Sequence, residues 1–283
     1  MGTSIKPEQF LVIVGAAKCG TTSLFDYLGQ HPAICPTRVK EPGFFTEHHY
    51  VPPLARRGVR DYEDFWPDFN PDVHKYALEG STGYTKWPEE IGVADRERRY
   101  GIKPRLVYLV RDPIERIESH FNYMTSRNAG GRLSVDDQYL IDISRYSAQI
   151  APYVEAFGKQ SIRVIDFSRL RSEPDSVCQE LYSWLGLDPH VLVDPGISNQ
   201  TATLQVSRLS RVVTLRRLAW HLPRSVRRVG KRMSMKWAPY NHHLVRLPPD
   251  RIKEIRELLS EDMSKLARDW DIDVTKWGFG DTV

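Results

Sequence analysis

The sequence predicts an α/β domain in which helices flank a central parallel β-sheet. Short apolar segments alternate with segments of helical periodicity between Phe10 and Leu185, which is typical of a parallel sheet with crossover helices. The chain has 283 residues, 41% of them hydrophobic and 27% charged, so it can form a full hydrophobic core. We expect one domain over residues 1–283 with a basic, variable insertion at about 195–249.

Apolar runs mark the strands of this sheet. The clearest run reads Arg-Leu-Val-Tyr-Leu-Val and is typical of a strand buried on both faces. Another apolar run, near the N-terminus, leads directly into a glycine-rich turn. The expected strands, in chain order, are Phe10–Val14, Tyr76–Leu78, Arg105–Val110 and Ile162–Phe167.

Helices are predicted where apolar residues recur every three or four positions. Gly29 is placed to end the first of them, and Ser172 is the expected N-cap of the third. The expected helices are Thr21–Gln30, one that opens at Arg111-Asp112-Pro113, one over about 173–185, and a last one from Pro248-Pro249-Asp250 to Trp270.

The sequence contains no apolar stretch of about 18 residues, the length that a membrane-spanning helix needs. Its first residues, Met1–Gln9, lack the features of a signal peptide. Cys19, Cys35 and Cys178 have spacings that fit neither a disulfide framework nor a metal site. We therefore expect a cytoplasmic protein with reduced thiols.

Positive charge is concentrated in one segment. The net charge is +4, yet Pro195–Pro249 contains eleven Lys or Arg residues and no Asp or Glu. Such a segment indicates an anionic partner, and we expect contact with the acceptor or a peripheral contact with an anionic membrane through residues 208–236. Nucleic acid is not expected, because the segment has few aromatic residues for base stacking.

The strongest functional signal is the loop from Gly15 to Ser23, between the first strand and its helix. Small residues let a backbone curl around an anion, and the N–H groups at a helix start point toward it. Lys18 adds a positive charge. The loop is not a Walker A motif, because Thr21 stands where that motif has its lysine. The pattern predicts a phosphate-binding loop of another kind.

This loop, Lys18-Cys19-Gly20-Thr21-Thr22-Ser23-Leu24, resembles the 5'-phosphosulfate loop of sulfotransferases that depend on 3'-phosphoadenosine-5'-phosphosulfate (PAPS). The resemblance implies the P-loop-NTPase-like sulfotransferase fold. It also implies that Arg111, after a strand, and Ser119, on the following helix, bind the 3'-phosphate. The implied cofactor-binding residues are Lys18, Cys19, Gly20, Thr21, Thr22, Ser23, Arg111 and Ser119.

A further segment, Lys40-Glu41-Pro42 followed by Phe44-Phe45, resembles the heparan-sulfate-type branch of the family and its bacterial relatives. That resemblance makes Glu41 the expected general base, with His31, His48 and His49 as weaker candidates. The branch usually has a lysine after the glutamate of the next strand, where this chain has Gly80. This difference argues against a heparan-type polysaccharide acceptor.

Together these features predict transfer of a sulfuryl group from PAPS to a hydroxyl acceptor, which leaves 3'-phosphoadenosine-5'-phosphate (PAP). Lys18 and Glu41 are the expected catalytic residues, and no metal is expected. The acceptor stays open between a carbohydrate, a glycolipid, a phenol and a secondary metabolite. Two alternatives remain: a P-loop-type nucleotide kinase, and a non-catalytic protein that binds an anion or a membrane.

Overall fold

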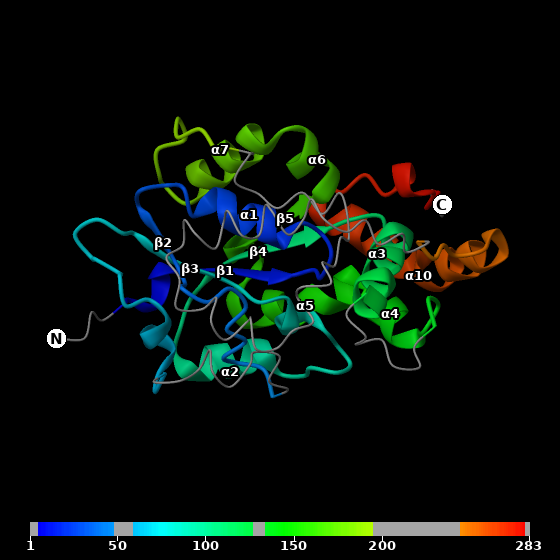
Figure 1. The fold of residues 1–283 in the computed structure, drawn as a ribbon, viewed down its shortest axis with the longest axis horizontal. Helices are drawn as coiled ribbons and strands as arrows, with labels where there is room; N and C mark the ends of the chain where they lie inside the picture. The colour runs from blue at the N-terminus through cyan, green and yellow to red at the C-terminus, as the bar shows by residue number, and fades with distance from the viewer. Residues whose placement is uncertain (1–4, 48–58, 127–133, 195–243, 281–283) are drawn as a thin grey trace, which may run out of the picture.

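A five-stranded parallel sheet in the order β2-β3-β1-β4-β5 forms the centre of the protein (Figure 1). The computed structural model describes residues 5–47, 59–126, 134–194 and 244–280. The strands are β1 (Phe10–Gly15), β2 (Ile34–Pro36), β3 (Tyr76–Gly80), β4 (Arg105–Val110) and β5 (Ile162–Asp166).

β1 is the middle strand. Leu11 lies in register with Leu78 of β3 on one side and with Arg105 of β4 on the other. All residues of β1 are buried, which explains why its sequence is continuously apolar and does not alternate.

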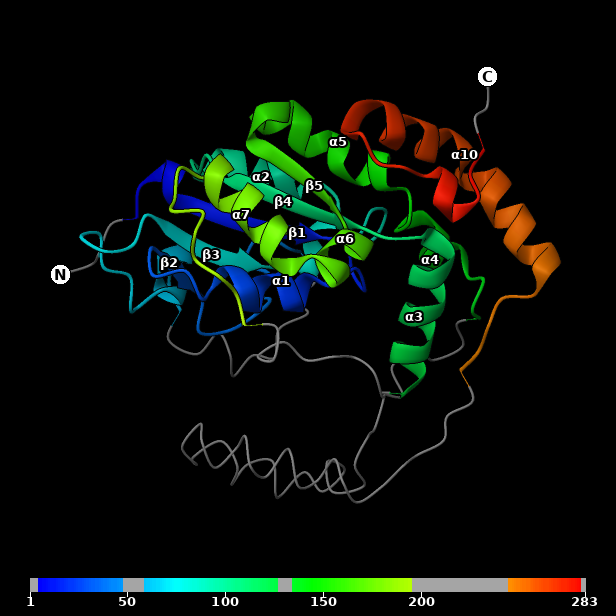
Figure 2. The ribbon, with the colours of Figure 1, turned by 90° about the horizontal axis from the view of Figure 1, so that it is seen from above.

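Helices cover both faces of the sheet. α1, α6 and α7 lie on one face, whereas α2 and α5 lie on the other, with α10 packed on α5 (Figures 1 and 2). The helices are α1 (Thr21–Leu28), α2 (Val93–Tyr100), α3 (Pro113–Ser126), α4 (Gln138–Asp142), α5 (Tyr146–Phe157), α6 (Phe167–Ser172), α7 (Pro174–Trp184) and α10 (Pro249–Trp270). Short 3₁₀ turns are η1 (Pro7–Gln9), η3 (Tyr62–Phe65), η4 (Thr82–Thr85), η5 (Lys159–Ser161) and η8 (Thr275–Trp277).

The predicted strands are confirmed within two residues at each end, and so is the α/β class. The prediction for Ser172 is wrong. It is the last residue of α6, and its hydroxyl donates to the carbonyl of Ser168 at 3.0 Å. Glu173 is the N-cap of α7, with Pro174 at the first helical position. The helix expected over about 173–185 is therefore α7, and the short separate helix α6 precedes it.

Most of the basic segment falls on residues 195–243, outside the described ranges, as do residues 48–58 with His48 and His49. The described chain resumes at Leu244 and contacts α3. Asn122 donates to the carbonyl of Val245 at 3.0 Å, and the N–H of Leu247 donates to Glu118 at 3.0 Å. Within the described ranges, no helix has both the length and the apolar character needed to cross a bilayer.

α2 carries a buried carboxyl group that has no hydrogen-bond partner in the described part of the chain. Glu97 is fully buried, and neither of its carboxyl oxygens has a hydrogen-bond partner among the described residues. Burial, reinforced by the nearby carboxyl of Glu79, raises the pKa of Glu97 well above its ordinary value, and Arg96 opposes this only in part. Burial therefore favours the neutral form of the Glu97 carboxyl group.

We expect Glu97→Met to stabilise the protein, and increasingly so as the pH rises. The pKa of Glu97 is higher in the folded state than in the unfolded state. Its contribution to the free energy of unfolding is therefore fully present below the unfolded-state pKa and is lost as the pH rises through the folded-state pKa. At about pH 8 the expected gain in the free energy of unfolding is about 1–3 kcal/mol, measured by urea denaturation. Exposed Glu155→Gln on α5 is the control. A Met variant that is less stable at every pH would contradict the prediction.

Candidate active site

The predicted functional segments all follow carboxyl ends of strands. The phosphate loop follows β1, the segment with Glu41 follows β2, and Arg111 follows β4. Carboxyl ends of parallel strands lie at one edge of a sheet, the usual ligand edge of such folds. In Figure 1, α3 lies beyond this edge.

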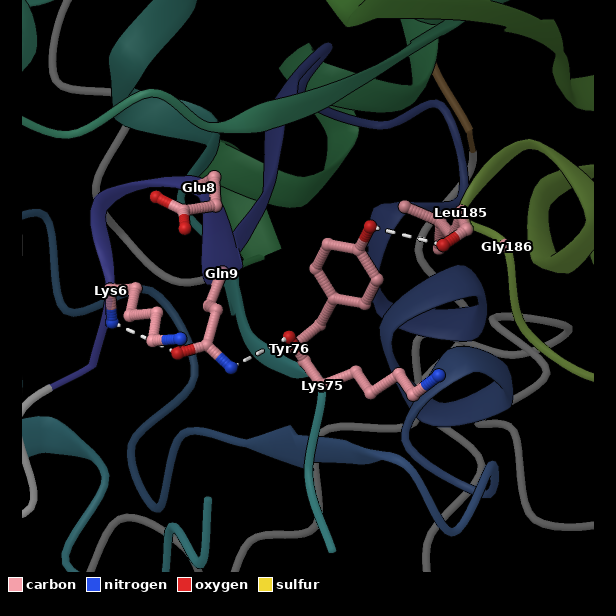
Figure 3. Close-up of a pocket in the computed structure, with 7 residues that line it drawn as sticks. All are labelled: Lys6, Glu8, Gln9, Lys75, Tyr76, Leu185 and Gly186. Atoms are coloured by element: carbon pink, nitrogen blue, oxygen red, sulfur yellow. Dashed lines mark hydrogen bonds between the residues drawn. The ribbon is translucent and has the colours of Figure 1, made fainter. Parts of the chain in front are cut away.

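A pocket of about 330 Å³ lies at the opposite edge, before β1 and β3 (Figure 3). The hydroxyl of Tyr76 donates to the carbonyl of Leu185 there, at 3.0 Å. None of the predicted site residues lines this pocket. Its lining residues are Lys6, Glu8, Gln9, Lys75, Tyr76, Leu185 and Gly186. We therefore place the candidate active site at the carboxyl edge.

Gly20 shapes the phosphate loop. It precedes α1 with a left-handed φ of 87°, and a Cβ added to it would lie 2.6 Å from the ring of Phe167. Both its conformation and its surroundings therefore require glycine. α1 starts directly afterwards at Thr21, so the N–H groups of Thr21, Thr22 and Ser23 belong to its first turn, where a helix has no carbonyl partners of its own.

Cys19 is part of the loop's interior. Its N–H donates to the carbonyl of Ala16 at 3.2 Å, and its sulfur lies 3.9 Å from the hydroxyl of Tyr146. Burial raises the pKa of the thiol to about 11, so the thiol is not a nucleophile at neutral pH. The N–H groups that begin α1 are thus better placed as anion donors, while cofactor contact by Cys19 stays a prediction.

Lys18 extends from the loop to α3. It has a left-handed φ of 71°, and its ammonium lies 4.0 Å from the ring centroid of Tyr123. Ser119 is partly buried and precedes Tyr123 by one helical turn, so both lie on the same face of α3. The loop lysine and the predicted phosphate-binding serine thus share one side of the site.

Arg111 lies against the same loop. Its guanidinium donates to the carbonyl of Lys18 at 3.4 Å and lies 5.0 Å from the ring centroid of Phe167. It also forms an ion pair with Glu115 at 2.7 Å. The hydroxyl of Tyr146 donates to the carbonyl of Arg111 at 2.7 Å. Sequence reasoning missed Phe167 and Tyr146, because only the folded chain brings them beside the loop.

Glu41 has an unusual backbone conformation. Its φ is 62°, in the left-handed region, although Glu41 is not a glycine and is followed by Pro42. Such a conformation costs about 1–3 kcal/mol and is often found at functional sites. Its carboxylate is 43% exposed and forms an ion pair with Lys40 at 2.7 Å.

The Glu41 loop is attached to the end of β3. The N–H of Gly43 donates to the hydroxyl of Ser81 at 2.9 Å, and that hydroxyl donates to Glu79 at 2.5 Å. Burial raises the pKa of Glu79, which lies within the core. The strand that carries Glu79 therefore also fixes the loop that carries the predicted base.

His31, the weaker candidate base within the described ranges, is buried in the core. Its Nδ1 accepts from the N–H of Ala33 at 3.1 Å, and its Nε2 lies 3.3 Å from the carbonyl of Asp188. It precedes β2, at the amino edge of the sheet. The structure does not bring it to Glu41 or Lys18.

Sequence reasoning missed two buried residues of α3 near the site, His120 and Arg116. His120 on α3 is buried, and its Nδ1 lies 3.1 Å from the guanidinium of Arg116. Because arginine can only donate, the imidazole proton is on Nε2. Burial, then Arg116, Lys86 and Lys18, lowers the pKa of His120 well below its ordinary value.

The described ranges contain no group of three or more His, Cys, Asp or Glu residues able to hold a metal ion. The expectation that the reaction uses no metal stays a prediction.

Known proteins resemble this chain in sequence and in fold. Bifunctional heparan sulfate N-deacetylase/N-sulfotransferase 4 of Mus musculus is 25% identical over 205 residues, which cover 64% of this chain and 22% of that protein. Heparan sulfate glucosamine 3-O-sulfotransferase 3A1 of Mus musculus is 24% identical over 192 residues, which cover 62% of this chain and 45% of that protein. The chain thus spans less than half the length of these relatives.

The sulfotransferase from Alicyclobacillus acidocaldarius is a structural neighbour, with a TM-score of 0.67 at 21% identity over 97% of this chain and 100% of that one. This likeness confirms the predicted fold. The sulfotransferase domain family matches residues 8–266, a stretch that includes the phosphate loop, Glu41, Arg111 and Ser119. From this match, the chain belongs to the sulfotransferase domain family.

Proposed function

We propose that the chain transfers the sulfuryl group of PAPS to a hydroxyl group of an acceptor, with Glu41 as the general base. The observation that carries the proposal is the contact of Arg111 with the carbonyl of Lys18. It joins the predicted 3'-phosphate site to the predicted phosphosulfate loop at the edge where Glu41 is also attached through Ser81.

On the donor side, the chain supplies positive charge and N–H groups. The first turn of α1 and Lys18 bind the 5'-phosphosulfate, and Lys18 neutralises the charge that develops on the leaving oxygen. Arg111 and Ser119 bind the 3'-phosphate, for which Arg111 exchanges part of its ion pair with Glu115. This dependence on positioning and charge suits transfer through a loose transition state.

On the acceptor side, Glu41 takes the proton of the attacking hydroxyl group. Its partly exposed carboxylate is accessible to an acceptor, and the attached β3 fixes its position. The relatives named above are heparan sulfate enzymes, but this chain lacks the lysine of that motif at Gly80. We therefore favour a smaller carbohydrate, a glycolipid or a secondary metabolite as the acceptor.

The basic segment is proposed to serve the acceptor. Arg246, the basic residue of this segment that lies within the described ranges, forms an ion pair with Glu118 of α3, adjacent to Ser119. This attachment supports a position near the site, where an anionic acceptor or membrane surface could contact the segment.

The test is calorimetric titration with PAP in the absence of magnesium, with ATP as the comparison. We expect PAP to bind with micromolar or tighter affinity and ATP to bind at least about tenfold more weakly, because ATP lacks a 3'-phosphate for Arg111 and Ser119. Binding of ATP with magnesium in preference to PAP would instead support a P-loop-type nucleotide kinase.

A further inference from the structure

Tyr146, the first residue of α5, joins the two parts of the predicted cofactor site. Its side chain is fully buried, and its hydroxyl donates to the carbonyl of Arg111 at 2.7 Å. The same hydroxyl oxygen lies 3.9 Å from the sulfur of Cys19 in the phosphate loop. One side chain therefore contacts both the backbone of the predicted 3'-phosphate arginine and the loop that is predicted to bind the 5'-phosphosulfate.

The hydrogen bonding of this hydroxyl group is defined. Its single hydrogen points to the carbonyl of Arg111, so in the contact with Cys19 the phenolic oxygen accepts from the thiol. Burial raises the pKa of Tyr146 well above its ordinary value, and it raises the pKa of the Cys19 thiol to about 11. Both groups therefore stay protonated near neutral pH and keep these contacts.

Other helices hold the backbone of Tyr146 from two sides. Two residues before it, the hydroxyl of Ser144 accepts from the guanidinium of Arg116 of α3 at 2.7 Å. Directly after it, the N–H of Ser147 donates to the carboxylate of Asp262 of α10 at 3.0 Å, and the Ser147 hydroxyl donates to the Asp262 carbonyl at 2.9 Å. Arg116 and Asp262 are both buried, so these contacts fix the start of α5.

Tyr146 acts on the main chain of Arg111 and leaves the guanidinium available. Arg111 lies at the junction of two elements, after Val110 ends β4 and before Pro113 begins α3. Its guanidinium forms an ion pair with Glu115 at 2.7 Å, and the side chain of Glu115 is 55% exposed, so an incoming anion can replace that carboxylate. The bond from Tyr146 holds the backbone while the guanidinium changes its partner.

We propose that Tyr146 is a positioning residue, whose hydroxyl sets the spacing between Arg111 and the phosphate loop to that of the 3'-phosphate and the 5'-phosphosulfate of PAPS. This inference rests on the proposed function. A shift of Arg111 relative to the loop would weaken its bidentate contact with the 3'-phosphate, while the N–H groups of α1 would keep the 5'-phosphate. Tyr146 thus determines the preference for a nucleotide that carries a 3'-phosphate.

The test compares PAP with 5'-AMP, which differ by the 3'-phosphate alone. Tyr146→Phe removes the hydroxyl group and keeps the ring. We expect this variant to reduce the preference for PAP over 5'-AMP, measured by calorimetry, about 5- to 10-fold, while the affinity for 5'-AMP changes by less than about twofold.

Tyr153→Phe is the matched control. Tyr153 is a second buried tyrosine of α5, and its hydroxyl also donates to a backbone carbonyl, that of Tyr84, at 2.9 Å. The control therefore loses a hydrogen bond of the same kind and should keep the wild-type preference for PAP. Urea denaturation of both variants shows that their losses of stability are similar.

A double-mutant cycle shows whether the effect passes through Arg111. In an Arg111→Met background, Tyr146→Phe should change the preference for PAP by less than about twofold, because the group that it positions is absent. Additive losses, an unchanged preference in Tyr146→Phe, or equal weakening of PAP and 5'-AMP would overturn the inference. Wild-type protein that does not prefer PAP to 5'-AMP would overturn the proposed function instead.

Discussion

Lys18→Ala should weaken PAP binding about 10- to 100-fold and reduce sulfuryl transfer at low PAPS concentration about 10²- to 10³-fold. The two effects differ because the charge on the leaving oxygen develops fully only in the transition state. Calorimetry with PAP and initial rates with labelled PAPS measure them separately.

The variant should keep the fold of the loop. Lys18 has a left-handed φ, which alanine and lysine adopt at similar cost, and its ammonium lies over the ring of Tyr123. That contact is worth about 0.5–1 kcal/mol, too little to unfold the protein. Lys103→Ala, at an exposed position before β4, is the control. If Lys18→Ala bound PAP as tightly as wild type, the loop would not be the phosphosulfate site.

Elements with local signals could be predicted from sequence. β1 is buried throughout and β4 is buried after its first residue, Arg105, so their apolar runs reveal them directly. The phosphate loop has its signal in consecutive residues, and the family that it indicated is confirmed by the match over residues 8–266. The assignment to sulfotransferases thus depended on short motifs whose residues are neighbours in the chain.

Elements that depend on tertiary contacts were missed. β2 has three residues and, among the described strands, pairs with β3 alone, and α5 contains Pro152, which disrupts a helical pattern. Nothing in the sequence groups His120 and Tyr146 with Lys18, because α3 and α5 bring these residues to the phosphate loop only on folding. Residues that surround a motif from distant segments carry no local signal.

Glu41→Gln should reduce the kcat of sulfuryl transfer about 10²- to 10⁴-fold while the affinity for PAP stays within about threefold of wild type. Glutamine has the shape of glutamate but cannot take the proton of the acceptor hydroxyl. Its loss of the ion pair with Lys40 is a small effect, because both side chains are partly exposed. The rate is measured with an acceptor found by screening with labelled PAPS, or by the slower hydrolysis of PAPS, since water must lose a proton as well.

Glu47→Gln separates loss of the base from loss of nearby charge. Glu47 lies on the same loop, is 70% exposed and forms an ion pair with Arg96, so its substitution removes one negative charge without touching the proposed base. We expect this variant to transfer at nearly the wild-type rate. Equal losses in both variants would indicate a general electrostatic effect of the loop. A Glu41→Gln variant with unchanged kcat would mean that another group takes the proton, and the strained backbone at Glu41 would then need a structural explanation.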